Sequence, residues 1–316
     1  MAQGSVDRVS DSLVQARALR KRFGVVEAVR GIDIDVQAGE VFGFLGPNGA
    51  GKSSTMRMIG CVSPRSAGEL QVLGMDPDAD GPRIRARLGV VPQQDNLDVE
   101  LSVRDNLHVY GRYFGMSRAA VRAKAIELLD FVQLTERAAD PVEQLSGGMK
   151  RRLTIARSLV NEPELMLLDE PTTGLDPQAR HLLWDRLFRL KRHGVTLIIT
   201  THYMDEAEQL CDRLVVMDGG LIVAEGSPRE LIAGYSTRDV LELRCRPGAQ
   251  RGWRERLDGL ADRVEELPDR LLLYTSDGEA ALVAAHQRGV QPVSSLVRRS
   301  TLEDVFLRLT GRSLVD

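Results

Sequence analysis

The chain has 316 residues, of which 43% are hydrophobic and 28% charged, and its formal net charge is −3. This length exceeds that of one ordinary domain, and the hydrophobic content is too high for a disordered chain. The small negative charge gives no general attraction to nucleic acid or to an anionic membrane. We therefore expect one domain of about 200–250 residues and a smaller second unit.

Cysteine usage and the N-terminal sequence limit the compartment. Cys61, Cys211 and Cys245 are widely separated and form no CxxC pair, which excludes a disulfide framework or structural zinc site and favours a reducing compartment. Residues 1–12 are polar and lack the features of a secretory signal, so we expect a flexible N-terminus. Apolar runs reach only about five residues, against the roughly 20 that span a bilayer. We expect a cytoplasmic chain with no transmembrane segment.

Strand-like apolar runs and helical patterns follow one another along the chain. Strands are predicted at residues 13–19, 32–36, 40–45, 165–168, 195–200 and 214–217, and helices at 54–59, 119–132, 150–159 and 179–192. This alternation predicts an α/β fold with a mainly parallel sheet. The helical texture from about residue 94 to 160 predicts a subdomain inserted into that sheet-based core.

After residue 236 the pattern changes. Strands are predicted at 240–245, 263–267 and 270–275, and helices at 278–287 and 301–309. We therefore expect a domain at 13–236 and a small C-terminal α+β extension at 237–316, to which the sequence assigns no chemistry.

The first chemical signal is a glycine-rich stretch directly after the predicted strand at 40–45. It matches G-x-x-x-x-G-K-[ST] and comprises Gly46, Pro47, Asn48, Gly49, Ala50, Gly51, Lys52 and Ser53, with Ser54 in the helix that follows. Glycines let backbone N–H groups approach phosphate oxygens, and the helix directs its positive end at them. We expect Lys52 to neutralise the outer phosphates of a nucleotide and the Ser53 hydroxyl to hold Mg²⁺.

The second signal is an apolar strand that ends in two carboxylates, Asp169 and Glu170. In open α/β folds ligands bind at the carboxyl ends of strands, so Asp169 is a candidate Mg²⁺ residue and Glu170 a candidate general base for water attack. Alone, the string also fits a solvated strand end. Beside a phosphate loop it favours ATP hydrolysis.

The third signal is Leu-Ser-Gly-Gly-Met at residues 145–149, directly before a predicted helix. Ser146 is a favoured N-cap residue, and Gly147 and Gly148 leave backbone N–H groups uncovered, which predicts a second anion-binding helix start. Two such starts with one Asp-Glu pair favour a dimer in which these residues of one copy contact the γ-phosphate held by the other. Arg151 and Arg152 follow, and we expect them on a solvated helix face rather than at an anion.

These stretches, together with Gln93, Asp176 and His202, resemble in order the ATP-binding cassette of ABC transporters, over about residues 14–232. The resemblance implies a P-loop NTPase cassette with an inserted helical subdomain. It also implies that Phe23 stacks on adenine, Gln93 senses Mg²⁺ and the attacking water, Asp176 contacts the opposite copy, and His202 reaches the γ-phosphate. Without this resemblance, we would interpret Phe23 as a core residue and His202 as a structural residue at a strand end. Met149 replaces the usual glutamine.

Four longer segments, at 90–98, 110–117, 179–184 and 301–311, are similar to the ATPases of daunorubicin-type multidrug exporters and of rhizobial nodulation lipo-oligosaccharide exporters. This similarity implies an ATPase with ATP and Mg²⁺, a homodimer of cassettes in the closed state, and a separate ABC-2 type membrane subunit. It further implies a peripheral position on the cytoplasmic face of the cell membrane and export of a drug-like or lipid-like amphiphile.

Other functions of such cassettes remain open at this point. A DNA or ribosome machine usually carries two cassettes, a coiled-coil insertion or a basic surface, none of which is evident here, so we expect no nucleic-acid partner. A regulator without hydrolysis is disfavoured by the presence of Glu170 and His202. Importer and lipoprotein-release ATPases are nearer alternatives.

Overall fold

The computed structural model describes residues 12–246 and 252–311, which form two compact units that divide between Glu225 and Gly226. Except for Ser12, the predicted flexible N-terminus lies outside the described residues. The predicted domain boundary after residue 236 falls later than this division, because α8 (Pro228–Tyr235) packs against α11 (Leu302–Thr310) of the second unit. Within the described residues, no helix is long and apolar enough to cross a membrane.

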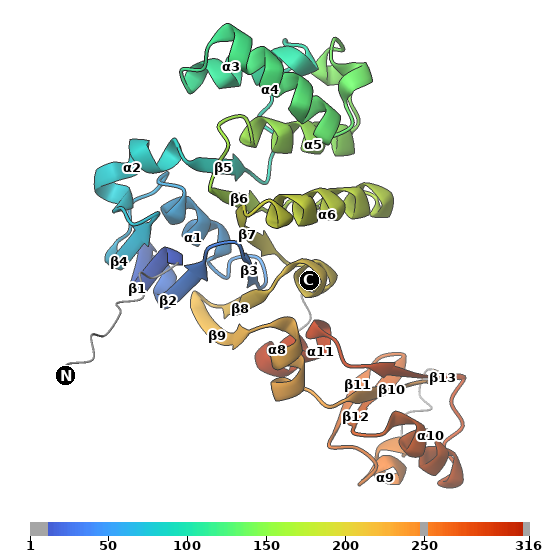
Figure 1. Ribbon diagram of the computed structural model, residues 1–316. Coiled ribbons are helices and arrows are strands. Elements are labelled where there is room, and N and C mark those ends of the chain that lie inside the picture. The colour runs from blue at the N-terminus through green and yellow to red at the C-terminus, as the bar shows by residue number, and fades with distance from the viewer. Residues whose placement is uncertain (1–11, 247–251, 312–316) are drawn as a thin grey trace, which may run out of the picture. The chain divides into compact units, whose positions relative to one another are not determined.

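The first unit is built on a six-stranded sheet, in which β5, β6, β7, β3 and β8 pair in parallel as predicted. Its order, visible in Figure 1, is β5 (Leu88–Val91), β6 (Leu165–Asp169), β7 (Thr196–Thr201), β3 (Val41–Leu45), β8 (Arg213–Asp218) and β9 (Leu221–Gly226). All five residues of β3 and all six of β7 are buried, because both faces of the sheet are covered. The carboxyl ends of these strands therefore share one edge.

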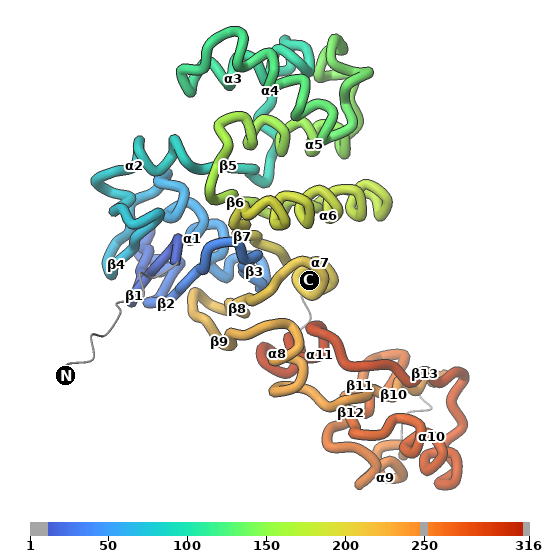
Figure 2. The backbone as a smooth tube through the Cα atoms, in the orientation of Figure 1, coloured from blue at the N-terminus to red at the C-terminus, as the bar shows by residue number. Residues whose placement is uncertain are grey.

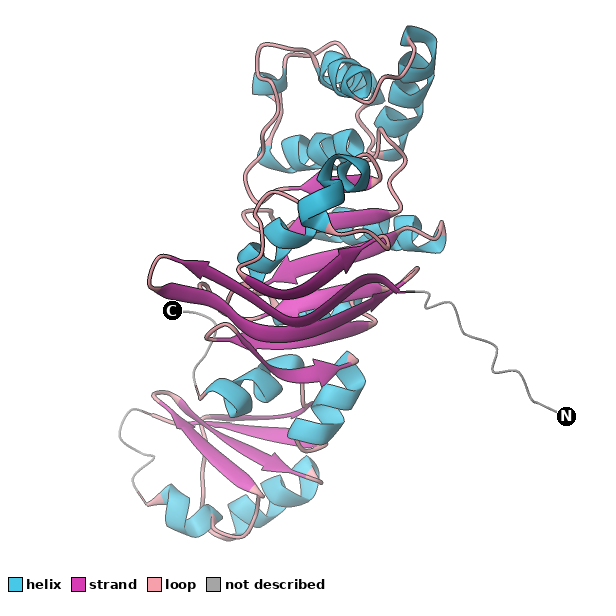
Figure 3. Cartoon of the chain, turned by 90° about the vertical axis from the view of Figure 1, so that its left-hand side faces the viewer, coloured by secondary structure: helices cyan, strands magenta, loops and turns pink. Residues whose placement is uncertain are grey.

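A second, antiparallel sheet was only partly predicted. Its order is β2 (Val26–Gln37), β1 (Ser12–Phe23) and β4 (Ala67–Val72). Figure 3 shows its long strands in magenta. The helix α1 (Lys52–Ile59) contacts both sheets, and one continuous core, with Phe42, Met58 and Ile198 among its members, lies between them. The helix that follows the phosphate loop is thus fixed from both sides.

The helical subdomain lies between β5 and β6 in the chain, as predicted. Figure 2 follows the backbone from β5 through this group of helices and back to β6. The helices are α3 (Val103–Tyr113), α4 (Arg118–Phe131) and α5 (Gly147–Ser158), with short 3-10 turns at Thr135–Arg137 and Val142–Gln144. A serine side chain caps each α-helix, which explains where each begins.

Three further helices complete the first unit. They are α2 (Pro77–Arg85), α6 (Pro177–Arg192) and α7 (Met204–Leu210). Helix α7 contacts β3 and β7, and α6 packs on α7 (Figure 2). Asp176 caps α6 through a hydrogen bond that its Oδ1 accepts from Ala179 N at 2.8 Å.

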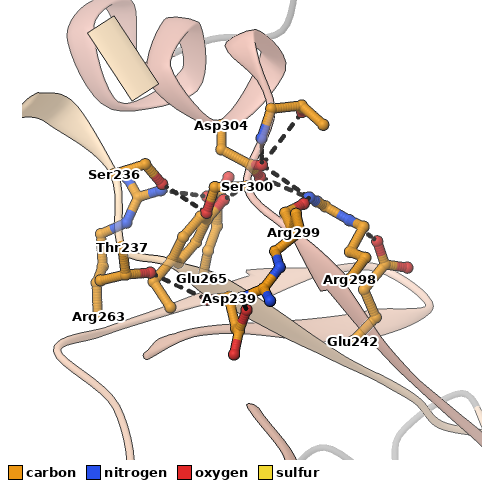
Figure 4. A network of polar contacts seen from close by, with 12 residues as sticks. Ser236, Thr237, Asp239, Glu242, Arg263, Glu265, Arg298, Arg299, Ser300 and Asp304 are labelled. Atoms are coloured by element: carbon orange, nitrogen blue, oxygen red, sulfur yellow. Dashed lines mark hydrogen bonds and ion pairs between the residues drawn. The ribbon is translucent and has the colours of Figure 1, made fainter. Parts of the chain in front are cut away.

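The second unit is an α+β fold, as predicted. Its antiparallel sheet has the order β11 (Arg263–Leu267), β12 (Arg270–Thr275), β10 (Asp239–Arg244) and β13 (Ser294–Arg299). The helices α9 (Trp253–Leu257) and α10 (Gly278–Gln287) accompany it, with α8 and α11. Figure 4 shows its polar network, where the Arg298 guanidinium contacts the carboxylates of Glu242 and Asp304.

Candidate functional site

The phosphate loop lies between β3 and α1, and its glycines are required sterically. A Cβ on Gly46 would lie 2.3 Å from the carbonyl oxygen of Met217. Gly51 has φ +104°, and a Cβ there would lie 2.5 Å from the carbonyl oxygen of Ala28. Backbone therefore packs on backbone at both positions, and only glycine fits without displacing a strand.

Lys52 is the first residue of α1, and it is buried although it carries an ammonium group (4% exposed). Its Nζ donates to the carbonyl oxygens of Gly46 at 2.6 Å and Pro47 at 3.0 Å, so the side chain curls back over its own loop. Burial lowers the pKa of Lys52, while the nearby carboxylates of Glu170 and Asp169 act in the opposite direction. The ammonium is thus held between the loop and the end of β6.

Asp169, the last residue of β6, lies next to α1. Its Oδ1 accepts hydrogen bonds from Ser53 Oγ at 3.2 Å and from the Thr200 hydroxyl. A serine hydroxyl and a carboxylate are oxygen ligands of the kind that Mg²⁺ prefers when it also binds phosphate. A cavity of about 410 Å³ adjoins this pair, and Ser53, Gln93 and Asp169 are among the residues that line it. These residues fit a magnesium–nucleotide complex.

Glu170 follows Asp169 and is buried, with the left-handed backbone angle φ +46°. Its Oε2 accepts hydrogen bonds from Gln93 Nε2 at 3.0 Å and Thr173 Oγ1 at 3.2 Å. Its Oε1 lies 3.3 Å from Nδ1 of His202. The structure therefore brings together Gln93, Glu170 and His202, which come from three separate segments of the sequence.

The electrostatics of Glu170 favour its ionised form. The contact with His202 is the main cause that lowers the pKa of this carboxyl; burial acts in the opposite direction, and the charge of Lys52 adds to the lowering. The group is therefore a carboxylate near neutral pH, which is the form that can accept a proton.

Phe23 and the second predicted anion site lie apart from this cluster. Phe23 ends β1 with 49% of its surface exposed, and its ring lies 4.8 Å from the ammonium of Lys21. Ser146 Oγ accepts from the backbone N–H of Met149 at 3.3 Å, so it caps its own helix. A Cβ on Gly148 would lie 3.1 Å from that of Ala179 in α6, whose N-cap is Asp176. Among the hydrogen bonds of the described residues, those of Ser146 and Asp176 stay within their own helices.

Three residues at the site, Arg151, Thr173 and Thr200, were not identified from the sequence. Arg151 is buried rather than solvated, and it contacts the segments that carry Gln93 and Glu170. Arg152 is half-buried and donates to the carbonyl oxygen of Val132 at 2.8 Å. Thr200 donates to Asp169 and accepts from the backbone N–H of Glu170 at 3.0 Å. The polar end of an otherwise apolar strand was the available signal for Thr200.

Comparison with known proteins agrees with this geometry. A family model described as "ABC transporter" matches residues 29–173, and one described as "Nodulation factor export protein NodI, C-terminal domain" matches residues 251–311. The chain is 46% identical over 308 residues to the Nod factor export ATP-binding protein I of Cupriavidus metallidurans, covering 96% of this chain and 99% of that protein. It is also 46% identical to the Rhizobium etli protein of that name, covering 99% and 98%.

A solved structure of an ATP-binding cassette supports the activity. This dimeric cassette, in a post-hydrolysis state bound to ADP and phosphate, matches with a TM-score of 0.63 and 28% identity, over 68% of this chain and 98% of that one. The predicted fold is thus confirmed, and of the two exporter groups that the sequence resembles, daunorubicin-type and nodulation-type, the relatives named for Nod factor export support the nodulation group. The chain belongs to the Nod factor export ATP-binding protein I family of ABC transporter ATP-binding proteins, and it hydrolyses ATP for transport.

Proposed function

We propose that this ATPase powers the export of a lipid-modified oligosaccharide through a separate ABC-2 type membrane subunit, at the cytoplasmic face of the membrane. The supporting observation is that the match to relatives named for Nod factor export extends along 96% of the chain, and so includes the second unit as well as the cassette. A match confined to the cassette would favour many transported compounds equally.

We assign the nucleotide contacts to the residues of the phosphate loop and to Phe23. The backbone N–H groups of the phosphate loop at residues 46 and 48–54 bind the phosphates, and Pro47, which has no N–H, shapes the turn between them. Lys52 neutralises the outer charge of the phosphates, and the exposed ring of Phe23 stacks on adenine. Ser53, Asp169 and Gln93 would hold Mg²⁺, which when bound supplies positive charge that stabilises the transferring phosphoryl group.

In the chemical step, Glu170 acts as general base. Its carboxylate accepts a proton from the water whose oxygen attacks the γ-phosphorus, and the bond from that phosphorus to the β–γ bridging oxygen breaks, so that ADP leaves with that oxygen. Gln93 and His202 orient the carboxylate and the water. His202 also donates to the γ-phosphate. The pKa of Glu170 is lowered, so the carboxylate is already available at neutral pH.

The complete site requires two chains. Ser146, Gly147, Gly148 and Asp176 of one copy face the nucleotide bound by the other copy, so two ATP molecules close a head-to-tail homodimer. This arrangement is supported by the hydrogen bonds of Ser146 and Asp176, which stay within their own helices, and by the dimeric state of the similar cassette. Hydrolysis removes the shared γ-phosphate, and the copies separate.

Export is tested in cells that synthesise a radiolabelled lipo-chitooligosaccharide and express this chain together with an ABC-2 type membrane subunit. We expect label in the medium with the wild-type chain, and a reduction on the order of 10²-fold with Glu170→Gln, because hydrolysis is lost. The matched control is Glu127→Gln, whose exposed carboxylate pairs with Lys124 on α4. Equal label with the wild-type chain and Glu170→Gln would contradict the proposed export.

Dimerisation is tested by light scattering of purified Glu170→Gln after size-exclusion chromatography. We expect ATP to convert a species of 34.9 kDa to one of twice that mass, and we expect the wild-type chain to hydrolyse ATP and reopen. A Glu170→Gln monomer that binds ATP without a change of mass would contradict an ATP-driven dimer of this chain.

A further inference from the structure

Arg151, in the second turn of α5, is almost fully buried, with 4% of its surface exposed. Its guanidinium donates to three consecutive carbonyl oxygens at the end of β6. Nε donates to Pro171 O at 2.8 Å, and Nη2 donates to Asp169 O at 3.1 Å and Glu170 O at 3.2 Å. One side chain of the helical subdomain therefore holds the backbone that carries both site carboxylates.

The same guanidinium also reaches the segment after β5. Its Nη1 donates to the carbonyl oxygen of Pro92 and, at 3.5 Å, to that of Gln93. The carboxylate of Asp95 lies 3.5 Å from Nη1 and balances its charge, and Asp95 is itself fixed by Thr154 of α5 at 3.1 Å. Arg151 thus joins α5 to the segments of Gln93 and Glu170 at once.

This position matters because Glu170 has a backbone conformation that residues with a Cβ rarely adopt, φ +46°. Such a conformation persists only when its surroundings fix it. On one side, the Glu170 N–H donates to Thr200 O at 3.1 Å and to Thr200 Oγ1 at 3.0 Å. On the other side, the Glu170 carbonyl accepts from Arg151. The two contacts together set the direction of the Glu170 side chain.

We propose that Arg151 is a positioning residue for ATP hydrolysis, which clamps the backbone of Gln93 and Glu170 to α5 so that their side chains meet. The proposal rests on the assigned role of Glu170. Movement of the helical subdomain would then change the geometry of the catalytic pair through a single rigid group. Lysine can replace it only in part, because an ammonium lacks the planar set of five donors that reaches carbonyls in several directions.

The kinetic test uses the purified full chain with Arg151→Gln and Arg151→Lys. We expect kcat for ATP hydrolysis to fall on the order of 10- to 100-fold in Arg151→Gln, because small displacements of reacting groups have effects of this size. The KM for ATP stays within about threefold of the wild-type value, because the residue contacts no part of the phosphate loop. We expect the kcat of Arg151→Lys to lie between that of the wild-type chain and that of Arg151→Gln.

The matched control is Arg152→Gln. This neighbouring arginine also donates to carbonyl oxygens, but to those of Val132 and Gln133 at the end of α4, away from the site. We expect its kcat within about twofold of the wild-type value. The comparison separates the loss of any arginine–carbonyl contact made from α5 from the loss of this particular clamp.

Hydrogen exchange supplies a second readout that needs no turnover. In Arg151→Gln, the amides of residues 93–96 and of Glu170, Thr172 and Thr173 exchange faster, while the global unfolding temperature stays close to that of Arg152→Gln. Wild-type kcat in both Arg151 variants, unchanged exchange at these segments, or failure of both variants to fold would each overturn the proposal. If Glu170→Gln keeps its turnover, the assigned role of Glu170 fails, whereas exchange at residues 170–173 still tests the clamp.

Discussion

Replacement of Asp304 by alanine should destabilise the second unit more than any change at its surface. The Asp304 carboxylate is fully buried and accepts from Arg298 Nη1 at 2.7 Å and Nη2 at 2.9 Å. It also accepts from the backbone N–H of Thr301 at 2.8 Å and from the hydroxyl of Tyr274 at 3.2 Å. One carboxylate therefore closes the start of α11 and ties it to β12 and β13.

The expected loss can be estimated from these contacts. Breaking a buried ion pair from one side costs about 3–5 kcal/mol. The lower end of this range applies here, because Arg298 would still pair with the carboxylate of Glu242 at 2.7 Å and because one quarter of the Arg298 side chain is exposed to water. The same carboxylate also caps the start of α11, and the loss of this cap adds about 1 kcal/mol to the cost. We therefore expect Asp304→Ala to lower the free energy of unfolding of the second unit by about 3–4 kcal/mol.

Urea unfolding measures this loss in the full chain. The chain has two tryptophans, and a Trp184→Phe background leaves the buried Trp253 of α9 as the fluorescent reporter of the second unit. The control is Asp269→Asn, an exposed carboxylate that pairs with Arg270 at 3.0 Å, which we expect to leave the urea midpoint unchanged. A loss below about 1 kcal/mol for Asp304→Ala would refute the estimate, since that is the range of surface pairs.

The same pair predicts a pH dependence. Burial alone would raise the pKa of Asp304, but the hydrogen bonds from Arg298 and from the Thr301 backbone outweigh it and lower the pKa below 3.8. An acid with a lowered pKa stabilises the folded state above its unfolded pKa and loses that contribution as the pH falls through the folded value. The difference between the wild-type chain and Asp304→Ala should therefore be constant above about pH 5 and shrink below about pH 4. A difference that grows on acidification would contradict the assignment.

Two further predictions concern the first unit. Gly46→Ala should weaken ATP binding at least about tenfold, measured by equilibrium fluorescence, because the new Cβ would lie 2.3 Å from Met217 O. The control is Gly39→Ala, which has φ +77° and open space around the new Cβ. It should lose only about 1–2 kcal/mol of folding stability through its backbone angle and bind ATP normally. Burial raises the pKa of Glu206, so the carboxyl stabilises the fold when protonated and loses this contribution as the pH rises. Glu206→Gln should therefore gain in Tm relative to the wild-type chain as the pH rises above the ordinary carboxyl range, and a pH-independent difference would contradict this.

The sequence predicted elements whose pattern is local. Residues 263–267 and 270–275 alternate or run apolar between turn residues, and both form strands with those bounds. The antiparallel sheet was only partly predicted: strands were expected within β1 and β2 but not at β4 (Ala67–Val72), which begins with two small exposed residues and buries only Leu70 and Val72. Such a strand is stabilised by pairing with β1, which its own sequence does not reveal.

The helix α5 shows the limit of helical periodicity. Arg151 shares a face with Thr154, Ile155 and Ser158, all of them buried, so its spacing carried a signal of burial. The adjacent Arg152 has the same chemistry and points toward α4. Sequence alone does not distinguish the two arginines, because the difference depends on which segment packs against each face of α5. For Arg151 that segment includes Pro92 and Gln93, which are 58 or more residues away in the sequence.

Motifs identify the groups that would touch the nucleotide, whereas tertiary contacts identify the groups that hold them. Lys52, Ser53, Asp169 and Glu170 stand in short strings because each string follows one strand end. The left-handed backbone of Glu170 is fixed by Thr200 from a neighbouring strand and by Arg151 from an inserted helix. Neither residue belongs to the sequence motif that contains Glu170. From its sequence motifs, a cassette that retained every motif residue but lost Arg151 would be predicted to be active. The clamp predicts that it would bind ATP and turn it over slowly.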